Sequence, residues 1–129
     1  MNREILFKAK RKDNGKWVEG YYRRIPCMGM LEHYIMPRNP KNRMEQYAID
    51  PDTLCQYTGL TDKNGRKIWE NDITYIRSSG LSGYGLIKYE NGNLVLVDSK
   101  RKRTYSLYGE WKIRKDGNIF DNADLLEGE

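Results

Sequence analysis

The order of apolar and polar residues along the chain predicts short β-strands joined by tight turns. Ile5, Phe7 and Ala9 alternate along the first apolar segment, and residues 13–15, Asp-Asn-Gly, have the composition of a hairpin turn. Apolar and aromatic residues resume at Trp17 and continue to Tyr22. Residues 5–22 are therefore expected to form an opening β-hairpin.

Prolines interrupt this pattern between residues 24 and 41, where Pro26, Pro37 and Pro40 lie. Proline has no backbone N–H to donate to a neighbouring strand, so we expect a long loop here, with room for one edge strand. Residues 58–65 carry two turn signals and predict a compact loop, and the three glycines of residues 78–85 predict another.

The second half of the chain has the pattern of a meander. Short strands are expected at residues 73–76, 86–87, 94–97, 104–107 and 119–120, and a capped helical turn at residues 123–127. Short strands separated by Gly and Asn favour a small barrel or roll over a βαβ protein. The pattern predicts a mostly β fold with short antiparallel strands.

The length of 129 residues suits one domain or two small β units with a shared core. We expect a hairpin and proline-containing loop region at residues 1–56 and a small barrel at residues 57–129. Ten Tyr and three Trp supply much of the area that such thin units bury.

The formal net charge of +5 permits attraction to nucleic acid, although acidic residues are interleaved along most of the chain. Two basic clusters stand at predicted hairpin tips, and tyrosines that could stack on bases lie near the second. The candidate residues for binding nucleic acid or a protein partner are Lys8, Lys10, Arg11, Lys12, Tyr84, Lys100, Arg101, Lys102, Arg103, Tyr105 and Tyr108. The alternative is that these tips are solvated and discourage edge-to-edge aggregation.

Residues for catalysis are few. His33 is the sole histidine, and Cys27 and Cys55 have no partner at metal-ligand spacing, so they are expected to be ordinary free cysteines. Glu70 and Asp72 could together bind a divalent cation, but acidic pairs at turns more often cap backbone N–H groups. No catalytic residue, metal or cofactor is predicted, with Glu70 and Asp72 kept as the alternative metal pair.

The cellular location is expected to be the cytoplasm, because the amino end does not resemble a leader segment and the cysteines are few. The apolar runs are far shorter than the ~20 residues that a membrane-spanning helix needs, so no membrane partner is expected. A thin core also favours a homo-oligomer, in which partner subunits complete the buried surface.

Three segments together resemble the YopX family of phage and prophage proteins. They are residues 3–21, with Arg-Glu-Ile and Trp-Val-Glu-Gly-Tyr; residues 56–73, with Gln-Tyr-Thr-Gly-Leu-Thr-Asp-Lys-Asn-Gly and Ile-Trp-Glu-Asn-Asp-Ile; and residues 117–126, with Gly-Asn-Ile-Phe-Asp-Asn. They occur in the order that the family has. The usual Glu-Gly-Asp of the family stands here as Glu70-Asn71-Asp72.

The resemblance implies a mostly β fold with a small SH3-type barrel in the C-terminal half, in a bacterial host. It carries over no catalytic residues, because the family is known mainly through uncharacterised proteins. We therefore expect a non-enzymatic binding or assembly module that acts on protein or nucleic acid. The alternative is a small metal-dependent hydrolase or nuclease that uses Glu70 and Asp72.

Overall fold

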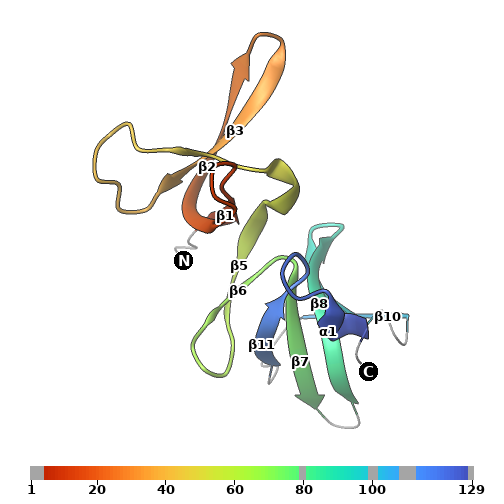
Figure 1. Cartoon of the computed structure of the whole chain (residues 1–129). Helices are drawn as coiled ribbons and strands as arrows, with labels where there is room; N and C mark the ends of the chain where they lie inside the picture. Colours follow the sequence, from red (N-terminus) through yellow and green to blue (C-terminus); the bar gives the residue numbers. More distant parts are fainter. Residues whose placement is uncertain (1–4, 79–80, 99–101, 108–112, 128–129) are drawn as a thin grey trace. The chain divides into compact units, whose positions relative to one another are not determined.

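The computed structural model describes residues 5–78, 81–98, 102–107 and 113–127 of the chain (Figure 1). The fold is mostly β, with two antiparallel sheets and a short helix near the C-terminus, as predicted. The chain divides into two compact units, Met1–Tyr57 and Thr58–Glu129.

The N-terminal sheet has the strand order β4-β3-β2-β1-β5-β6. Its elements are β1 (Phe7–Lys10), β2 (Trp17–Cys27), β3 (Met30–Pro37), β4 (Tyr47–Ala48), a single 3₁₀ turn (Pro51–Thr53), β5 (Cys55–Thr61) and β6 (Lys67–Trp69). The predicted opening hairpin is confirmed, because β1 pairs with β2 around a turn in which Gly15 has a φ of 70°. The core of the N-terminal unit contains Ala9, Ile35 and Ile49.

The C-terminal sheet has the order β10-β9-β8-β7-β11. Its strands are β7 (Asp72–Ser78), β8 (Leu81–Glu90), β9 (Asn93–Asp98), β10 (Arg103–Ser106) and β11 (Ile113–Asn118), and α1 (Asp124–Glu127) follows. The sheet packs one face on a core of Ile68, Ile76, Ile87, Leu96 and Ile113. Over the described residues this half is an open sheet that does not close into the expected barrel. No helix in the described part of the chain is long and apolar enough to cross a membrane.

The loop predicted for residues 24–41 is wrong for residues 24–37. β2 continues through Pro26 to Cys27, and β3 returns from Met30, so the two strands form one long hairpin. Proline is tolerated because β1 pairs with β2 no farther than Gly20, which leaves the second edge of β2 open at Pro26.

Three shorter predictions also differ from the structure. Residues 58–61 and 81–85 are strand rather than loop, and residues 119–120 form a turn rather than a strand. In the first two cases cross-strand pairing continues through glycines or polar residues, which local propensity assigns to turns. At residues 119–120 the strand ends because the Asn118 side chain accepts backbone hydrogen bonds from Phe120 and Asp121. The helical turn near the C-terminus is confirmed as α1.

Candidate functional site

The register of the N-terminal strands sorts their side chains onto two faces. Ala9 pairs with Val18, and both pack in the core with Ile35. Side chains alternate along a strand, so the intervening residues of β1 and β2 belong to the opposite face. We call this the cation–aromatic face and define it by Lys8, Lys10, Trp17, Glu19, Tyr21 and Arg23.

Two lysines of this face lie against Trp17. The Nζ atoms of Lys8 and Lys10 are 4.6 and 5.5 Å from the centroid of the Trp17 ring. At such distances each cation–π contact contributes about 0.5–1 kcal/mol. Lys8 is buried, whereas Lys10 and Trp17 are half-buried. The sheet thus holds two cations beside a large aromatic ring.

The cation–aromatic face continues along β2. Tyr21 is 47% exposed, and Arg23, two residues farther on, is exposed. Together with Trp17 they present two aromatic rings and a cation on one side of one strand. Rings with accessible faces can stack on unpaired bases, and neighbouring cations can contact phosphates.

The turn after β1 offers a partner less positive charge than its sequence suggests, because Arg11 already contacts residues of its own unit. Arg11 donates hydrogen bonds of 2.9 and 2.6 Å to the two carboxylate oxygens of Asp13, and its guanidinium carbon is 4.0 Å from the centroid of the Tyr47 ring. The hydrogen bond to Asp13 raises the pKa of Arg11, which stays charged but is engaged within the unit. Lys12 is exposed.

The excess positive charge lies in the N-terminal unit. Residues 1–57 contain eleven Lys and Arg against seven Asp and Glu, a net charge of +4, and residues 58–129 contain twelve against eleven, a net charge of +1. Long-range attraction of an anionic partner therefore acts mainly on the unit that carries the cation–aromatic face.

Among the described residues of the second predicted basic cluster, the cations and the tyrosines lie in different surroundings. Lys102 and Arg103 are exposed, but Tyr105 packs against the core of the C-terminal sheet. Tyr84 belongs to the opposite face by register, with its ring 5.2 Å from Tyr75. Three further candidates, Lys100, Arg101 and Tyr108, lie outside the described residues.

Tyr84 takes part in an internal network on that opposite face. Arg114 donates hydrogen bonds of 2.7 and 2.9 Å to Asp116, and its guanidinium carbon is 5.2 Å from the centroid of the Tyr75 ring. The hydrogen bond from Arg114 is the main reason that the pKa of Asp116 is lowered, and a hydrogen bond from Tyr84 adds to it. These contacts hold Tyr84 in the sheet.

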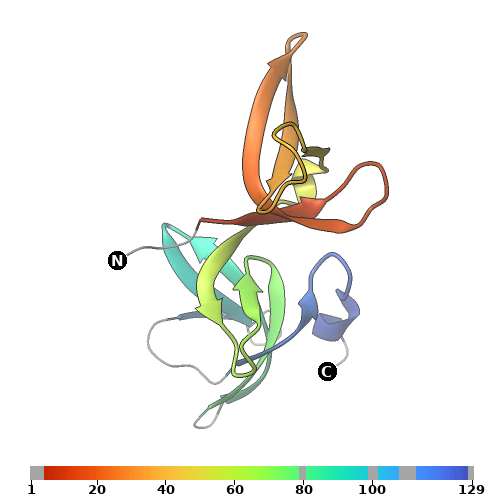
Figure 2. The same cartoon turned by 90° about the vertical axis from the view of Figure 1, so that its left-hand side faces the viewer.

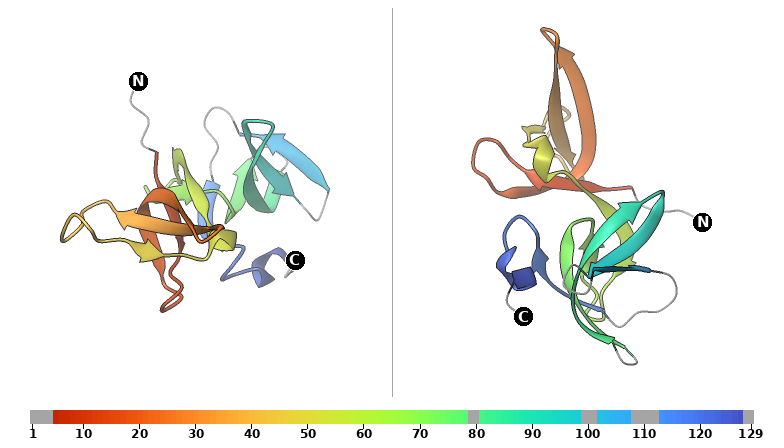
Figure 3. Two further views of the ribbon diagram at one scale, coloured as in Figure 1. Left: turned by 90° about the horizontal axis from the view of Figure 1, so that it is seen from above. Right: turned by 90° about the vertical axis from the view of Figure 1, so that its right-hand side faces the viewer.

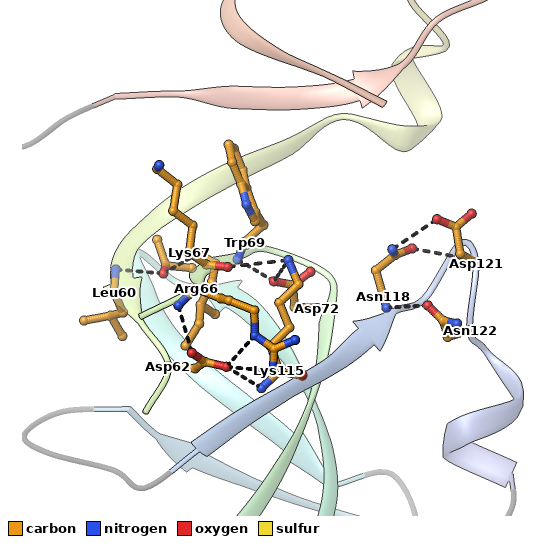
Figure 4. A network of polar contacts seen from close by, with 12 residues as sticks. Leu60, Asp62, Arg66, Lys67, Trp69, Asp72, Lys115, Asn118, Asp121 and Asn122 are labelled. Carbon is orange, nitrogen blue, oxygen red and sulfur yellow. Dashed lines mark hydrogen bonds and ion pairs between the residues drawn. The ribbon is translucent and has the colours of Figure 1, made fainter. Parts of the chain in front are cut away.

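The alternative metal pair, Glu70 and Asp72, is arranged for structure. Asp72 is fully buried, accepts a hydrogen bond of 2.7 Å from the backbone N–H of Trp69, and lies 3.3 Å from the ammonium nitrogen of Lys115 (Figure 4). Glu70 is half-buried beside Asn71, whose φ of 72° makes the turn. No group of three His, Cys, Asp or Glu residues in the described chain could hold a metal ion.

Asp62 is the centre of a second polar network, also drawn in Figure 4. Its carboxylate accepts backbone hydrogen bonds of 2.9 Å from Asn64, 2.9 Å from Arg66 and 3.0 Å from Lys115. Burial raises the pKa of Asp62, but these hydrogen bonds outweigh burial and lower it. This carboxylate therefore joins the β5–β6 turn to β11.

The remaining motif residues also hold turns. The Asn118 side chain accepts hydrogen bonds from the backbone of Phe120 and Asp121. Asp50 caps the 3₁₀ turn by accepting a hydrogen bond of 3.0 Å from the N–H of Asp52. These motif residues thus stabilise turns of the fold.

The sole histidine is held within the N-terminal sheet. The ring of His33 is stacked on Tyr22 with a centroid separation of 5.8 Å, and its Nδ1 lies 2.5 Å from the Tyr22 hydroxyl. Cys27 and Cys55 are both free, and Cys55 is buried. Within the described residues, His33 does not form a nucleophile–base pair with Cys27 or Cys55.

Sequence reasoning did not place Trp17, Tyr21 and Arg23 in a binding surface. The sequence could have indicated it, because these residues and Glu19 occupy every second position of the predicted strand and so share one face. Lys8 and Lys10 are the predicted residues that the structure brings together with them. Register across β1 and β2 was needed to join these two sets.

The fold is that of a mostly β protein with two antiparallel sheets and two compact units. The family model described as YopX protein matches residues 6–127, so the chain belongs to the YopX family. The chain is similar to the crystal structure of protein EF1440 from Enterococcus faecalis, with 19% sequence identity and a TM-score of 0.50. The match covers 97% of this chain and 99% of that chain. At this identity the likeness shows the fold alone. No match was found among curated proteins.

Proposed function

We propose that this protein is a non-enzymatic nucleic-acid-binding module that holds a single strand on the cation–aromatic face. The observation that carries the proposal is the pair of lysines placed beside Trp17, with Tyr21 and Arg23 farther along the same strand. The net charge of +4 in the same unit supports it.

Single strands fit this face better than duplexes do. Aromatic rings can stack on unpaired bases, and each such contact contributes about 1–3 kcal/mol. A base that stacks on Trp17 would displace the ammonium groups of Lys8 and Lys10 toward the flanking phosphates. The two lysines would then supply the salt-dependent part of binding.

The alternative of a metal-dependent hydrolase has less support, because the buried carboxylate of Asp72 already faces an ammonium group. A bacterial cytoplasm and a phage or prophage origin remain part of the proposal. The free cysteines are compatible with that reducing compartment.

The test is fluorescence anisotropy with labelled single-stranded and duplex DNA and RNA at several salt concentrations. Replacing Lys8 and Lys10 by Gln should lower the salt slope by about 0.7 for each lost phosphate contact. Trp17→Ala should weaken binding about 5- to 150-fold, and Trp17→Phe should keep most of it.

The matched control replaces Lys102 and Arg103 by Gln, which removes two exposed cations from the other unit. This control should leave the affinity nearly unchanged apart from the small effect of net charge. Equal weakening by both pairs would remove the cation–aromatic face from consideration. Absence of saturable binding at low salt would overturn the proposal and make a protein the partner class to pursue.

A further inference from the structure

The β2–β3 hairpin carries an apolar tip that the proposed function does not use. β2 and β3 pair without interruption to Cys27 and Met30 at the tip. The last contact from β4 and its extension is the hydrogen bond of 3.0 Å from the N–H of Ile49 to the carbonyl of His33. Residues 25–32 therefore extend past the other strands of their unit, as Figures 2 and 3 show. We call them the arm.

The turn at the end of the arm has an unfavourable sequence for its conformation. Met28 and Gly29 have φ angles of 50° and 80°, the positive values of the tight hairpin turn that Asn-Gly fits best. An unbranched apolar residue at the first of these positions is strained, and Met28 is also 97% exposed. Met28 is thus unfavourable for the turn conformation and is also an apolar side chain exposed to solvent. Such a residue indicates a role outside the folded unit.

The apolar surface extends back from the tip. On the face of Ile25 and Cys27, Met30 is 72% exposed, Cys27 is exposed and Ile25 is half-buried. Leu31, which pairs with Pro26 on the opposite face, is 52% exposed. Exposed apolar surface of this kind marks a contact site, and methionine side chains adapt easily to the shape of a partner.

We propose that the arm is a self-association surface and that its occupant is the arm of a second copy of this chain. Arg23, which pairs with Tyr34, and Glu32, which pairs with Ile25, stand on one face of the hairpin two register positions apart, and both are exposed. A face with one charge of each sign is complementary to itself across a two-fold axis. With the axis along the arm, β2 of one copy lies opposite β3 of the other.

In that packing each Arg23 lies two register positions from the partner's Glu32, and Cys27 comes opposite the partner's Met30. A lipid surface would instead meet Glu32 close to Arg23, so this distribution favours a second copy as the occupant of the arm. The eight residues of the arm are far fewer than the roughly 20–30 residues a side of a standard interface, and the dimer should be reversible and weak.

The decisive experiment is a charge reversal followed by sedimentation velocity over a range of protein concentrations. Arg23→Glu and Glu32→Arg should each weaken the dimer at least about tenfold, because each places like charges together twice. An equimolar mixture of the two variants should regain dimers, since both contacts are then attractive. An effect confined to the single chain cannot produce that rescue.

A second variant separates association from folding. Met28→Asn suits the positive φ of the turn and should keep or raise Tm, while it weakens the dimer at least about tenfold. Cross-linking through Cys27 with a short bismaleimide should give a dimer for the wild-type chain and none for Cys27→Ser, because Cys55 is buried.

The inference shares Arg23 with the proposed function and otherwise rests on different residues. Met28→Asn should bind nucleic acid as the wild-type chain does, and Trp17→Ala should still dimerise. A monomer at all concentrations, or a dimer that survives Met28→Asn and both charge reversals, would overturn the self-association of the arm.

Discussion

Replacement of Asp62 by Asn tests whether the family motif at the β5–β6 turn is structural. One carboxylate oxygen accepts the backbone N–H groups of Asn64 and Arg66, and the other accepts the N–H of Lys115 and the Arg66 guanidinium. Asn retains one acceptor and places an NH₂ group against donors in either orientation of the amide. One orientation loses the backbone hydrogen bond from Lys115 and the one from the Arg66 guanidinium, and the other loses the two backbone hydrogen bonds from Asn64 and Arg66.

The expected cost follows from these contacts. A buried donor left without an acceptor costs about 1–3 kcal/mol. The Arg66 side chain is 54% exposed, so its ion pair adds little, and the backbone contacts dominate. We expect Asp62→Asn to lower the free energy of unfolding by about 3 kcal/mol, a large part of the stability of a small unit.

The pH dependence has a defined sign. The pKa of Asp62 is lower in the folded chain than in the unfolded chain, where it is near 3.9. Its contribution is therefore complete above the unfolded pKa and is lost as the pH falls through the folded pKa. The difference between wild type and variant should be constant near neutral pH and should narrow below about pH 4.

Urea unfolding followed by circular dichroism at neutral and acid pH measures both effects. Glu90→Gln removes the same charge from an exposed position of the same unit and should change the free energy of unfolding by less than about 0.5 kcal/mol. A cost below about 1 kcal/mol for Asp62→Asn, or a difference that does not narrow in acid, would refute the structural assignment.

Three further predictions concern backbone and thiol positions. Gly20→Ala should prevent folding of the N-terminal unit, measured by circular dichroism, because a Cβ would lie 1.9 Å from a backbone carbonyl oxygen of β3. As the control, Gly29→Ala places its Cβ in open space and should lower the free energy of unfolding by only about 1 kcal/mol, because of the positive φ. Asn71→Ala should cost about 1 kcal/mol in urea unfolding because of the φ of 72°, with Asn71→Gly less affected. A thiol reagent should modify Cys27 in the native chain and Cys55 only after denaturation, and rapid native reaction of both would contradict the buried position of Cys55.

The parts of the fold that local sequence predicts are those with strong turn chemistry. The Asp-Asn-Gly turn and the following Trp17 identify the first hairpin, and Asn91-Gly92 identifies the β8–β9 turn with φ angles of 51° and 80°. The arm was missed because its turn is Met28-Gly29 and its strand contains Pro26, so both local signals point to a loop. Pairing of β2 with β3 overrides them.

The sequence predicted only some residues of the candidate site, and the reason is related. Lys8 and Lys10 could be named from their clustering, but Tyr105 was named with them and packs in the core. Charge and aromatic content do not indicate which side of a sheet a residue occupies when neither strand end nor register is known. Trp17 joins the lysines only through pairing across β1 and β2.

The amino-acid sequence by itself determined the class of fold and the family, because strand periodicity, turn residues and motif order are local properties. Tertiary structure decided the rest: the two units, the open C-terminal sheet, the cation–aromatic face and the apolar arm. These features depend on which distant strands pair and in which register. A shift by one residue would move every side chain of a strand to the other face.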